Sequence, residues 1–515
     1  MKRAFSGLML ILLVSASVLS FNIPTVKAVT ITVPDDYPTI QEAINNANSG
    51  DTIFVRNGTY YEHVVVNKPL NLKGESRENT TIDWEGAEHT VEVTANYVNI
   101  SGFGIQRSTS QLIGNSSVMF NGGIGDSLTD CSVHYGYYGI ILWGSYECTV
   151  ANVTVEGSGT GLVAIDSSQI VFRDNEISDT AGIGLGVSRS TECLLRNNHM
   201  INCSGGFATG GSMVDHFFND IDTSNTIDGK HVYCLVNQTG LTVNPSTFPD
   251  AGSLTIANST GVIVENLTLS HSGMGVVFAY TNDSLIRNVT VSNNTGGYGI
   301  LVGMGINNTV SGCKVSDCFS GVTLSSEIND TVSGNVITNS DHFGIYLWNS
   351  SLNTIVGNDV LNSEWTCIYM EGSQNNTFHH NNFVNYSEAR VSGHANVWDD
   401  GYPSGGNYWS GFNPTDVYHG LYQNETGSDG IGDNPHVINA DNADRYPLVF
   451  PYGYAPTPDL NGDCVIDVLD FGKIALAFGA VPGLPIWNPY VDLNQDSIID
   501  IFDLVVIALH FGETS

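Results

Sequence analysis

The feature that most constrains this chain is a repeat of 22 to 24 residues that runs from about Asp130 to Phe383. Glycine followed by an apolar residue keeps the same period, from Gly139-Ile140 to Gly344-Ile345. The clearest recurring apolar positions are Val133, Val155, Ile177, Met200, Leu269, Val291, Val315, Ile337, Val360 and Phe383. Repeats of this length cannot bury an apolar face alone, so they must stack on one another, which predicts a solenoid.

The composition of each repeat indicates which solenoid forms. Apolar residues alternate over three to five positions, as in the sequence Gly-Ile-Tyr-Leu at 344–347, which is typical of strands. Glycine, asparagine, serine and threonine fill the gaps and favour tight corners. The pattern therefore predicts one coil of a parallel β-helix per repeat. Five asparagines share one column and are expected to stack their amides at a corner: Asn175, Asn198, Asn335, Asn358 and Asn381.

The N-terminal segment 1–28 has the features of a signal peptide. Lys2 and Arg3 precede an apolar run from Gly7 to Phe21, and Ala28 offers a small residue for cleavage. The apolar run is too short for a membrane span, and no later segment is long enough. We expect a secreted, extracellular protein that is associated with a cell surface or free; an uncleaved N-terminal anchor is the alternative.

The charge balance excludes some partners. The chain has 17 Lys and Arg against 52 Asp and Glu, a formal net charge of −35. Nucleic acid is therefore not an expected partner, because its binding depends on neutralising phosphates. An acidic surface also repels acidic polysaccharide unless a metal ion intervenes. The alternative is that the charge only keeps an exported protein soluble.

Cysteines and sequons are abundant. Several of the nine cysteines, among them Cys131, Cys148, Cys193 and Cys313, fall into repeat columns that also hold apolar residues, so we expect buried thiols rather than disulfides. Candidate N-glycosylation sites, which would make the chain a glycoprotein, include Asn57, Asn79, Asn152, Asn266, Asn288, Asn307, Asn349 and Asn424. The alternative for the sequons is chance in a chain rich in asparagine, serine and threonine.

The opening from Ile31 to Asp83 contains one amphipathic helix, expected over Tyr37 to Asn48, which would cover the open end of the β-helix. This opening, together with the segments 225–240, 251–270 and 396–412, resembles the NosD-type proteins of the pectin-lyase-like superfamily. The NosD family is named for a periplasmic copper-binding member and is related to carbohydrate-binding and sugar-hydrolysis modules. The resemblance spans about 31–451 and implies a mainly β, right-handed parallel β-helix.

No catalytic set that this superfamily uses is complete in the chain. Asp341 and His342 are the weak catalytic candidates, as an acidic residue and a histidine just before a strand. Copper would need clustered His, Met or Cys, and only His379 and His380 are adjacent, so copper is not carried over from the family name. A dense aromatic group is expected to plug the far end of the β-helix, with sugar stacking as the alternative: Trp398, Tyr402, Tyr408, Trp409, Tyr418 and Tyr422.

The strongest chemical motif is a pair of acidic loops 33 residues apart, DLNGDCVIDVLD and DLNQDSIIDIFD. Their spacing places six or seven hard oxygens around one ion at about 2.4 Å, which suits calcium. The predicted calcium ligands are Asp459, Asn461, Asp463, Val465 through its carbonyl, Asp467 and Asp470, then Asp492, Asn494, Asp496, Ile498 through its carbonyl, Asp500 and Asp503. A helix is expected after each loop, over 468–478 and 501–511, each ending before a glycine.

The two loop-helix units resemble a type I dockerin, whose family docks onto a cohesin-type domain of another protein. Cys464 and Ser497 stand where a loop glycine is usual, at a cost of about 1 kcal/mol each. The helix starts, Val468-Leu469 and Ile501-Phe502, are more apolar than the Ser/Thr pairs of many dockerins. Calcium affinity and the choice of cohesin therefore stay open.

Together these patterns predict an exported protein in five segments. We expect a carbohydrate-binding β-helix tethered to an extracellular assembly; the alternatives are a polysaccharide hydrolase or lyase and a structural surface-layer protein. The segments are a signal peptide at 1–28, the β-helix with its helical cap at 29–395, an aromatic cap region at 396–451, a proline-rich linker at 452–458 and the dockerin-like domain at 459–515.

Overall fold

A computed structural model describes residues 28–86, 88–106, 115–427, 429–453, 458–460, 465–481, 484, 486, 488, 491–494 and 498–513. The segment expected to be a signal peptide lies outside these ranges, except for Ala28. Most of the linker and the centres of the two acidic loops, 461–464 and 495–497, also lie outside them.

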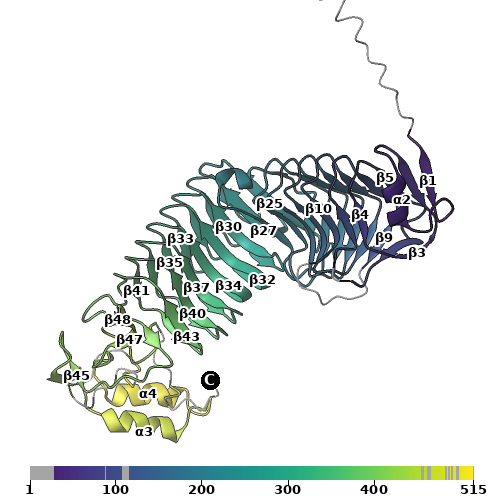
Figure 1. Cartoon of the computed structure of the whole chain (residues 1–515). Helices are drawn as coiled ribbons and strands as arrows, with labels where there is room; N and C mark the ends of the chain where they lie inside the picture. Colours follow the sequence, from purple (N-terminus) through teal and green to yellow (C-terminus); the bar gives the residue numbers. More distant parts are fainter. Residues whose placement is uncertain are drawn as a thin grey trace, which may run out of the picture.

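Residues 28–227 coil into three parallel sheets, which form the first half of a β-solenoid (Figure 1). The first sheet holds β1 (Thr30–Val33), β2 (Thr52–Val55), β5 (Asn71–Gly74), β8 (Asn99–Ser101), β11 (Ser127–Thr129), β14 (Thr149–Ala151), β17 (Val171–Arg173), β20 (Leu194–Arg196) and β23 (Asp220–Ile221). The second holds β4 (Val64–Val66), β7 (Val91–Val93), β10 (Ser116–Asn121), β13 (Tyr138–Trp143), β16 (Thr160–Ile165), β19 (Leu185–Ser188) and β22 (Phe207–Gly210). The third holds β3 (Gly58–Tyr61), β6 (Thr80–Asp83), β9 (Gly104–Gln106), β12 (Ser132–His134), β15 (Thr154–Glu156), β18 (Glu176–Ser178), β21 (His199–Ile201) and β24 (Thr226–Ile227).

The second half repeats this plan with longer strands. One sheet holds β26 (Thr242–Val243), β28 (Ile263–Glu265), β31 (Leu285–Arg287), β33 (Thr309–Ser311), β35 (Thr331–Ser333), β38 (Thr354–Val356) and β41 (Thr377–His379). The others hold β25 (Lys230–Val236), β27 (Ala251–Ala257), β30 (Met274–Ala279), β37 (Phe343–Trp348), β40 (Thr366–Glu371) and β43 (Glu388–Val391), then β29 (Thr268–Ser270), β36 (Val336–Thr338), β39 (Asp359–Leu361), β42 (Asn382–Val384) and β44 (Tyr408–Trp409). Two strands turn the corner between these sheets without a break: β32 (Thr290–Gly303) and β34 (Lys314–Ser325).

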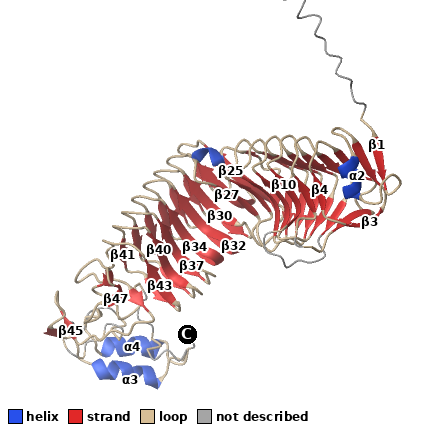
Figure 2. Ribbon diagram, viewed as in Figure 1, coloured by secondary structure: helices blue, strands red, loops and turns tan. Residues whose placement is uncertain are grey.

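The predicted apolar column lies in register along the core. Val155, Ile177 and Met200 pair across successive coils, and Ile337 pairs with Val360 in the second half. All five side chains are fully buried. The fold class predicted from the repeat, a mainly β chain coiled into a parallel β-helix, is confirmed (Figure 2).

The asparagine ladder also forms and is longer than predicted. Asn175 Nδ2 donates to Asn198 Oδ1 at 2.9 Å, and the next step reaches Asn225 at 2.7 Å. In the second half the steps from Asn335 to Asn358, Asn381 and Asn407 are 2.9, 2.8 and 2.8 Å. Each amide also satisfies a backbone carbonyl inside the coil, so the ladder pairs polar groups that burial would otherwise leave unsatisfied.

The solenoid changes direction between its two halves (Figure 1). The core residues form two clusters, one ending at Val232 and the other beginning at Tyr233. At this junction β24 pairs with β25 antiparallel, across a turn whose Asp228 and Gly229 have φ of 47° and 80°. A short 3₁₀ helix, η1 (Val214–Phe217), follows β22 here.

Both ends of the solenoid are covered. At the N-terminal end, α2 (Ile40–Asn46) buries Ile40, Ala43 and Ile44. It is shorter than the predicted 37–48 because Thr39 is the N-cap and Ala47 is already extended. At the far end Trp398 stacks on Phe378 at 4.2 Å, and Trp409 stacks on Phe383 at 4.5 Å. Both tryptophans are buried, as a plug requires, whereas Tyr418 and Tyr422 are exposed.

Beyond the solenoid, the described residues form short elements and two helices. Two small hairpins pair β45 (Tyr418–His419) with β46 (Glu425–Thr426) and β47 (His436–Asn439) with β48 (Asn442–Asp444). The helices α3 (Val468–Ala477) and α4 (Ile501–Leu509) share a small core that includes Ile474 and Ile507. Within the described ranges, no helix is both long and apolar enough to cross a membrane.

Candidate functional site

Six ring-bearing side chains form a continuous surface on the outside of the second half. We call this set the aromatic face: Phe319, His342, Phe343, Tyr346, Trp365 and Tyr369. The rings of Phe319 and His342 lie 4.2 Å apart, those of Phe343 and Tyr346 4.9 Å, and those of Trp365 and Tyr369 6.0 Å. These spacings are typical of direct aromatic contacts. The face spans three successive coils, because its residues lie on or just before β34, β37 and β40.

Strand alternation aims the aromatic face outward. Tyr346 lies between Ile345 and Leu347, which point into the core and are fully buried. Because neighbouring side chains of a strand point to opposite faces, Tyr346 must point out. Tyr346 pairs in register with Tyr369, which repeats the arrangement one coil later. All six rings are half-buried against one another and half-open to solvent.

Arg390 extends the face by one further coil. It pairs in register with Tyr369, and its guanidinium carbon lies 4.7 Å from the centroid of the Trp365 ring. This geometry is a cation–π contact, which holds both planar groups in place. Glu388 forms an ion pair with Arg390 at 2.5 Å, and both side chains are partly exposed.

The sequence-predicted pair Asp341 and His342 lies at the edge of the aromatic face. The backbone N–H groups of Asp341 and His342 donate to Cys318 O and Phe319 O, which fixes the corner. Burial raises the pKa of Asp341, and the nearby Glu364 carboxylate raises it further. The His342 ring packs on Phe319 and meets Trp365 edge-on at 5.6 Å. His342 is thus a member of an aromatic stack, and its catalytic role stays a prediction.

The sequence analysis missed the aromatic face. The signal was present, because Tyr346 and Tyr369 stand 23 residues apart and Phe343 precedes the first by three. The aromatic residues considered for sugar stacking in the sequence lie in the cap region, such as Trp398 and Trp409, and not in the strands of the coils.

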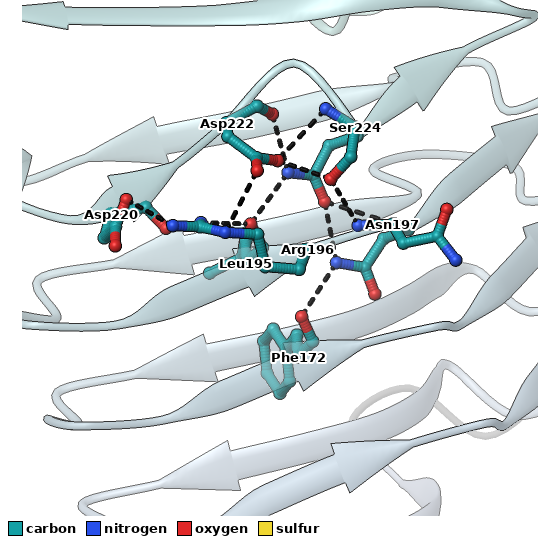
Figure 3. A network of polar contacts seen from close by, with 9 residues as sticks. Phe172, Leu195, Arg196, Asn197, Asp220, Asp222 and Ser224 are labelled. Carbon is teal, nitrogen blue, oxygen red and sulfur yellow. Dashed lines mark hydrogen bonds and ion pairs between the residues drawn. The ribbon is translucent and has the colours of Figure 1, made fainter.

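Two arginines of the first half form ion pairs at a corner of the coils. Arg173 and Arg196 pair in register, as their spacing predicts. Arg196 reaches Asp220 at 2.7 Å and Asp222 at 3.0 Å, and Arg173 reaches Asp174 at 2.8 Å. Figure 3 shows Arg196 held between the two carboxylates at the last coil before the junction. These arginines stabilise the corner and leave no cluster of free cations there.

One buried carboxyl pair interrupts the polar columns of the second half. Glu327 Oε1 accepts from Gly305 N at 2.6 Å, and Asp330 Oδ1 accepts from Asn308 N at 2.7 Å. Burial raises the pKa of Glu327 to about 9, with the nearby Asp330 carboxyl raising it further. Burial also raises the pKa of Asp330. Glu327 is therefore protonated at neutral pH and acts as an interior hydrogen-bonding group.

The two predicted calcium loops fold alike at their described ends. Asp467 caps α3 by accepting from Leu469 N at 2.7 Å, and Asp500 caps α4 by accepting from Phe502 N at 2.7 Å. Position 12 of each loop folds back on its start: Asp470 Oδ1 accepts from Leu460 N at 2.7 Å, and Asp503 Oδ1 accepts from Asn494 N at 3.2 Å.

This donor set suits calcium, because both position-12 carboxylates are buried beside the loop start and supply hard oxygens. Asp459, Val465, Asp492 and Ile498 are also described at the loop edges. The predicted ligands Asn461, Asp463 and Asp496, with Cys464 and Ser497 at the usual glycine positions, lie outside the described residues. Calcium binding therefore stays a prediction.

The histidine pair does not fit copper. His379 Nδ1 and His380 Nδ1 are 3.3 Å apart, but His380 stacks on Tyr452 at 3.9 Å and its Nε2 contacts Ser404 O at 2.8 Å. Copper sites need further His, Cys or Met ligands. No group of three or more His, Cys, Asp or Glu side chains placed to hold a metal ion occurs in the part of the chain that the structure describes.

The cysteines within the described ranges do not suit copper either. All eight described cysteines are free, and seven of them are buried in the core, as their columns predict. Burial raises the pKa of Cys131 to about 12 and that of Cys193 to about 11. These thiols stay protonated, whereas metal binding requires thiolates.

Comparison with solved structures finds other β-helix proteins at low similarity. The A-module of the Azotobacter vinelandii mannuronan C-5 epimerase AlgE6 is 14% identical, with 70% of this chain and 92% of that chain covered and a TM-score of 0.30. The catalytic domain of a GH87 alpha-1,3-glucanase is 13% identical, with coverages of 73% and 66% and a TM-score of 0.29. The receptor-binding protein of bacteriophage Det7 is 12% identical, with coverages of 65% and 74% and a TM-score of 0.33. Likeness at this level carries no argument about activity.

Comparison with protein families gives a broader match. No curated protein is similar to the chain at a significant level. The family model described as "Periplasmic copper-binding protein (NosD)" matches residues 44–234 and 218–414, which is most of the chain. These two matches cover both halves of the solenoid, including the aromatic face. The chain therefore belongs to the NosD family of parallel β-helix proteins.

Proposed function

We propose that this chain is an exported carbohydrate-binding protein whose aromatic face stacks against the sugar rings of a glycan. The observation that carries the proposal is the aromatic face itself, six contacting rings that the solenoid core does not need. Flat aromatic groups that are half-open to solvent suit ligands with one apolar face and a polar rim, as sugar rings have. Exposed apolar clusters of this kind mark binding surfaces.

The charges around the aromatic face favour a neutral glycan. Asp341, Glu364 and Glu371 lie on the coils of the aromatic face, and Arg390 is the cation that contacts one of its rings. Arg390 is already paired with Glu388. With a net charge of −35 over the whole chain, this surface repels uronates and other acidic sugars. The proposed ligand is thus a polysaccharide without carboxylates.

Binding has better support than cleavage. Acid–base cleavage of a glycosidic bond requires two carboxyl groups placed on either side of the bond. Asp341 has a raised pKa, as a general acid would, but His342 beside it is committed to ring contacts with Phe319 and Trp365. The polysaccharide hydrolase or lyase of the sequence analysis is the second candidate, and Asp341 is the residue that would carry it.

The C-terminal helices supply the tethering part of the proposal. Val468 and Leu469 open α3 with exposed fractions of 68% and 59%, and Ile501 and Phe502 open α4 with 61% and 60%. Apolar pairs that stay exposed at equivalent positions of two helices suit a protein partner. The partner we propose is a cohesin-type domain, bound when calcium orders the two loops, so that the β-helix is held in an extracellular or cell-surface assembly.

The binding proposal is tested by affinity electrophoresis of the full chain in gels containing neutral polysaccharides. Wild-type protein is expected to be retarded by at least one of them, and Trp365→Ala to lose that retardation. Trp143→Ala is the matched control, since Trp143 is 48% exposed on the first half, away from the aromatic face. Equal loss for Trp143→Ala and Trp365→Ala, or no retardation by any glycan, would contradict the proposal.

The tethering proposal is tested by removing calcium. Chelation is expected to lower the helical circular dichroism signal of α3 and α4 while the β-sheet signal persists, because metal binding and folding are coupled in such loops. Asp470→Ala with Asp503→Ala should give the same spectrum without chelator. An unchanged circular dichroism spectrum in both experiments would contradict the proposal that calcium orders the two loops.

A further inference from the structure

A cavity of about 280 Å³ lies on the outside of the solenoid, at the junction of its two halves. Its floor is a patch of small side chains on β30, β32 and β34, where Ala279, Gly303 and Ser325 stand in register on successive coils. The next residue of this column is Trp348, so the floor ends at an aromatic wall. The opposite wall comes from β22 and η1, where Phe217 packs against Val277 and Ala279.

The lining is uncharged and mostly apolar. The aromatic and thioether members are Phe217, Met274, Phe278, Tyr298, Met304, Tyr346 and Trp348. None of the described residues that line the cavity carries a charge. Thioether sulfur and aromatic edges favour contact with another aromatic ring. A carboxylate or an amine would lose its hydration here without gaining a partner.

One lining group lacks a hydrogen-bond partner. The Thr209 side chain is 4% exposed, and its Oγ1 has no partner within the described structure. Buried hydroxyls are normally hydrogen-bonded, so an unsatisfied one on a cavity wall indicates that a ligand or a water completes it. The other lining residues that carry a hydroxyl are Tyr298, Thr323, Ser325 and Tyr346.

We propose that this cavity binds an uncharged aromatic ring that carries one hydrogen-bonding group. An apolar cavity of roughly 150 Å³ already accepts benzene, so the volume here suffices for a substituted ring. A sugar ring suits the cavity less well than an aromatic ring, because its many hydroxyls would meet a lining that is mostly apolar. Thr209 Oγ1 supplies the hydrogen bond, and Tyr346 and Trp348 supply the stacking wall.

The cavity is continuous with the aromatic face, because Tyr346 belongs to both. Its ring lies 4.9 Å from Phe343 and 5.2 Å from Tyr369. This part of the inference rests on the proposed function: a neutral glycan on the aromatic face would place an aryl ester substituent in the cavity. The ligand that we propose is therefore a neutral glycan that bears aromatic esters.

The test uses methyl ferulate, a neutral phenolic ester, titrated into the full chain by calorimetry. Gly303→Leu is the blocking variant: the Gly303 φ is not left-handed, and a Cβ there would meet its nearest atom, Ser325 O, at 3.6 Å, an ordinary contact. The substitution therefore fills the cavity from a tolerant position. Methyl ferulate is expected to bind wild type and to bind Gly303→Leu at least tenfold more weakly, while the anion ferulate fails to bind.

Further variants keep the result interpretable. Thr209→Val conserves shape and should weaken binding several-fold, which covers the case in which Gly303→Leu does not fold. Trp143→Ala, outside both the cavity and the aromatic face, should leave methyl ferulate affinity within twofold. Binding by Gly303→Leu as tight as wild type, or no binding by wild type up to the solubility limit, overturns the inference. The proposed function has its own test: it is contradicted if Trp365→Ala is still retarded in gels that contain the polysaccharide.

Discussion

The same strand is built into both halves of the solenoid with one decisive difference. β13 reads YGIILW and β37 reads FGIYLW, at equivalent places of their coils. The inward residues are alike, and Ile140 and Ile345 are both fully buried. The outward residue differs: Ile141 is 3% exposed and is followed in register by Val163, whereas Tyr346 is half-exposed and is followed by Tyr369. The core fixes the coil, and one outward position per coil decides what the surface can bind.

The largest effect tests whether the inner columns are equivalent. Ile177→Ala and Ile337→Ala occupy the same column in the two core clusters, and each should cost about 2 to 5 kcal/mol of unfolding free energy. Chemical denaturation followed by circular dichroism measures both. Ile201→Ala, at a 44% exposed position, is the control and should cost little. A large difference between the two core variants would show that the halves are not built alike.

The second prediction concerns the pH dependence of stability and the buried Glu327. Glu327 occupies the column of the second half that is equivalent to the serine column Ser145, Ser167 and Ser190 of the first half. Its folded pKa of about 9 exceeds the usual value, so the folded state holds a proton that the unfolded state releases. The stability that this proton contributes is thus fully present at acidic pH, below the usual carboxyl pKa, and declines as the pH rises toward the raised folded pKa. Glu327→Gln should flatten this decline in thermal melts between pH 5 and 9. An equally steep decline in the variant would assign it to other groups.

The third prediction converts the outer surface of the second half into that of the first. Tyr346→Ile combined with Tyr369→Val should weaken glycan binding at least tenfold, about 1.4 kcal/mol, because the stacking surface is lost. Folding should change less than binding, since both positions already accept β-branched side chains in the first half. Affinity electrophoresis and thermal melts of the same preparation compare the two quantities. Full retention of binding would shift the site away from the aromatic face.

The smallest effect belongs to Arg390. Arg390→Ala removes the cation above Trp365 and should weaken glycan binding by about 0.5 to 1 kcal/mol. Arg390→Lys is the conservative control and should keep part of the affinity, because lysine retains the charge without the planar stack. Tighter binding by Arg390→Ala would mean that the guanidinium blocks the surface.

The sequence predicts well those features that recur with the repeat. The Val155 column recurs along the coils, and the Asn335 ladder recurs in several consecutive coils, so one missed residue would not hide either of them. Helices were placed to within a few residues, α3 and α4 ending at Ala477 and Leu509 against the predicted 478 and 511. The fold class rests on these repeated features and is confirmed, and the resemblance to the NosD family is confirmed by the family match.

The features that the sequence predicts poorly are those that occur only once in the chain. The aromatic face depends on which strand residue points outward at Tyr346 and Tyr369, and alternation in a short strand does not settle that without the register. The junction cavity depends on β22 and η1 meeting β30, contacts between segments about 65 residues apart. Asp341 and His342 were selected by residue type, although their surroundings are aromatic.

The asparagine ladder of the second half has a defined end. Asn407 is its last amide, and Asp444 Oδ2 accepts from both Asn407 N, at 2.7 Å, and Trp409 Nε1, at 3.0 Å. The Asp444 carboxylate accepts these hydrogen bonds and donates none to a further asparagine, so the ladder ends at Asp444. The three coils before this terminator each bring their own asparagine, Asn335, Asn358 and Asn381, and their own apolar residue, Ile337, Val360 and Phe383. Duplication or deletion of a single coil within the series therefore preserves both ends, which gives such genes a simple route to solenoids of different length.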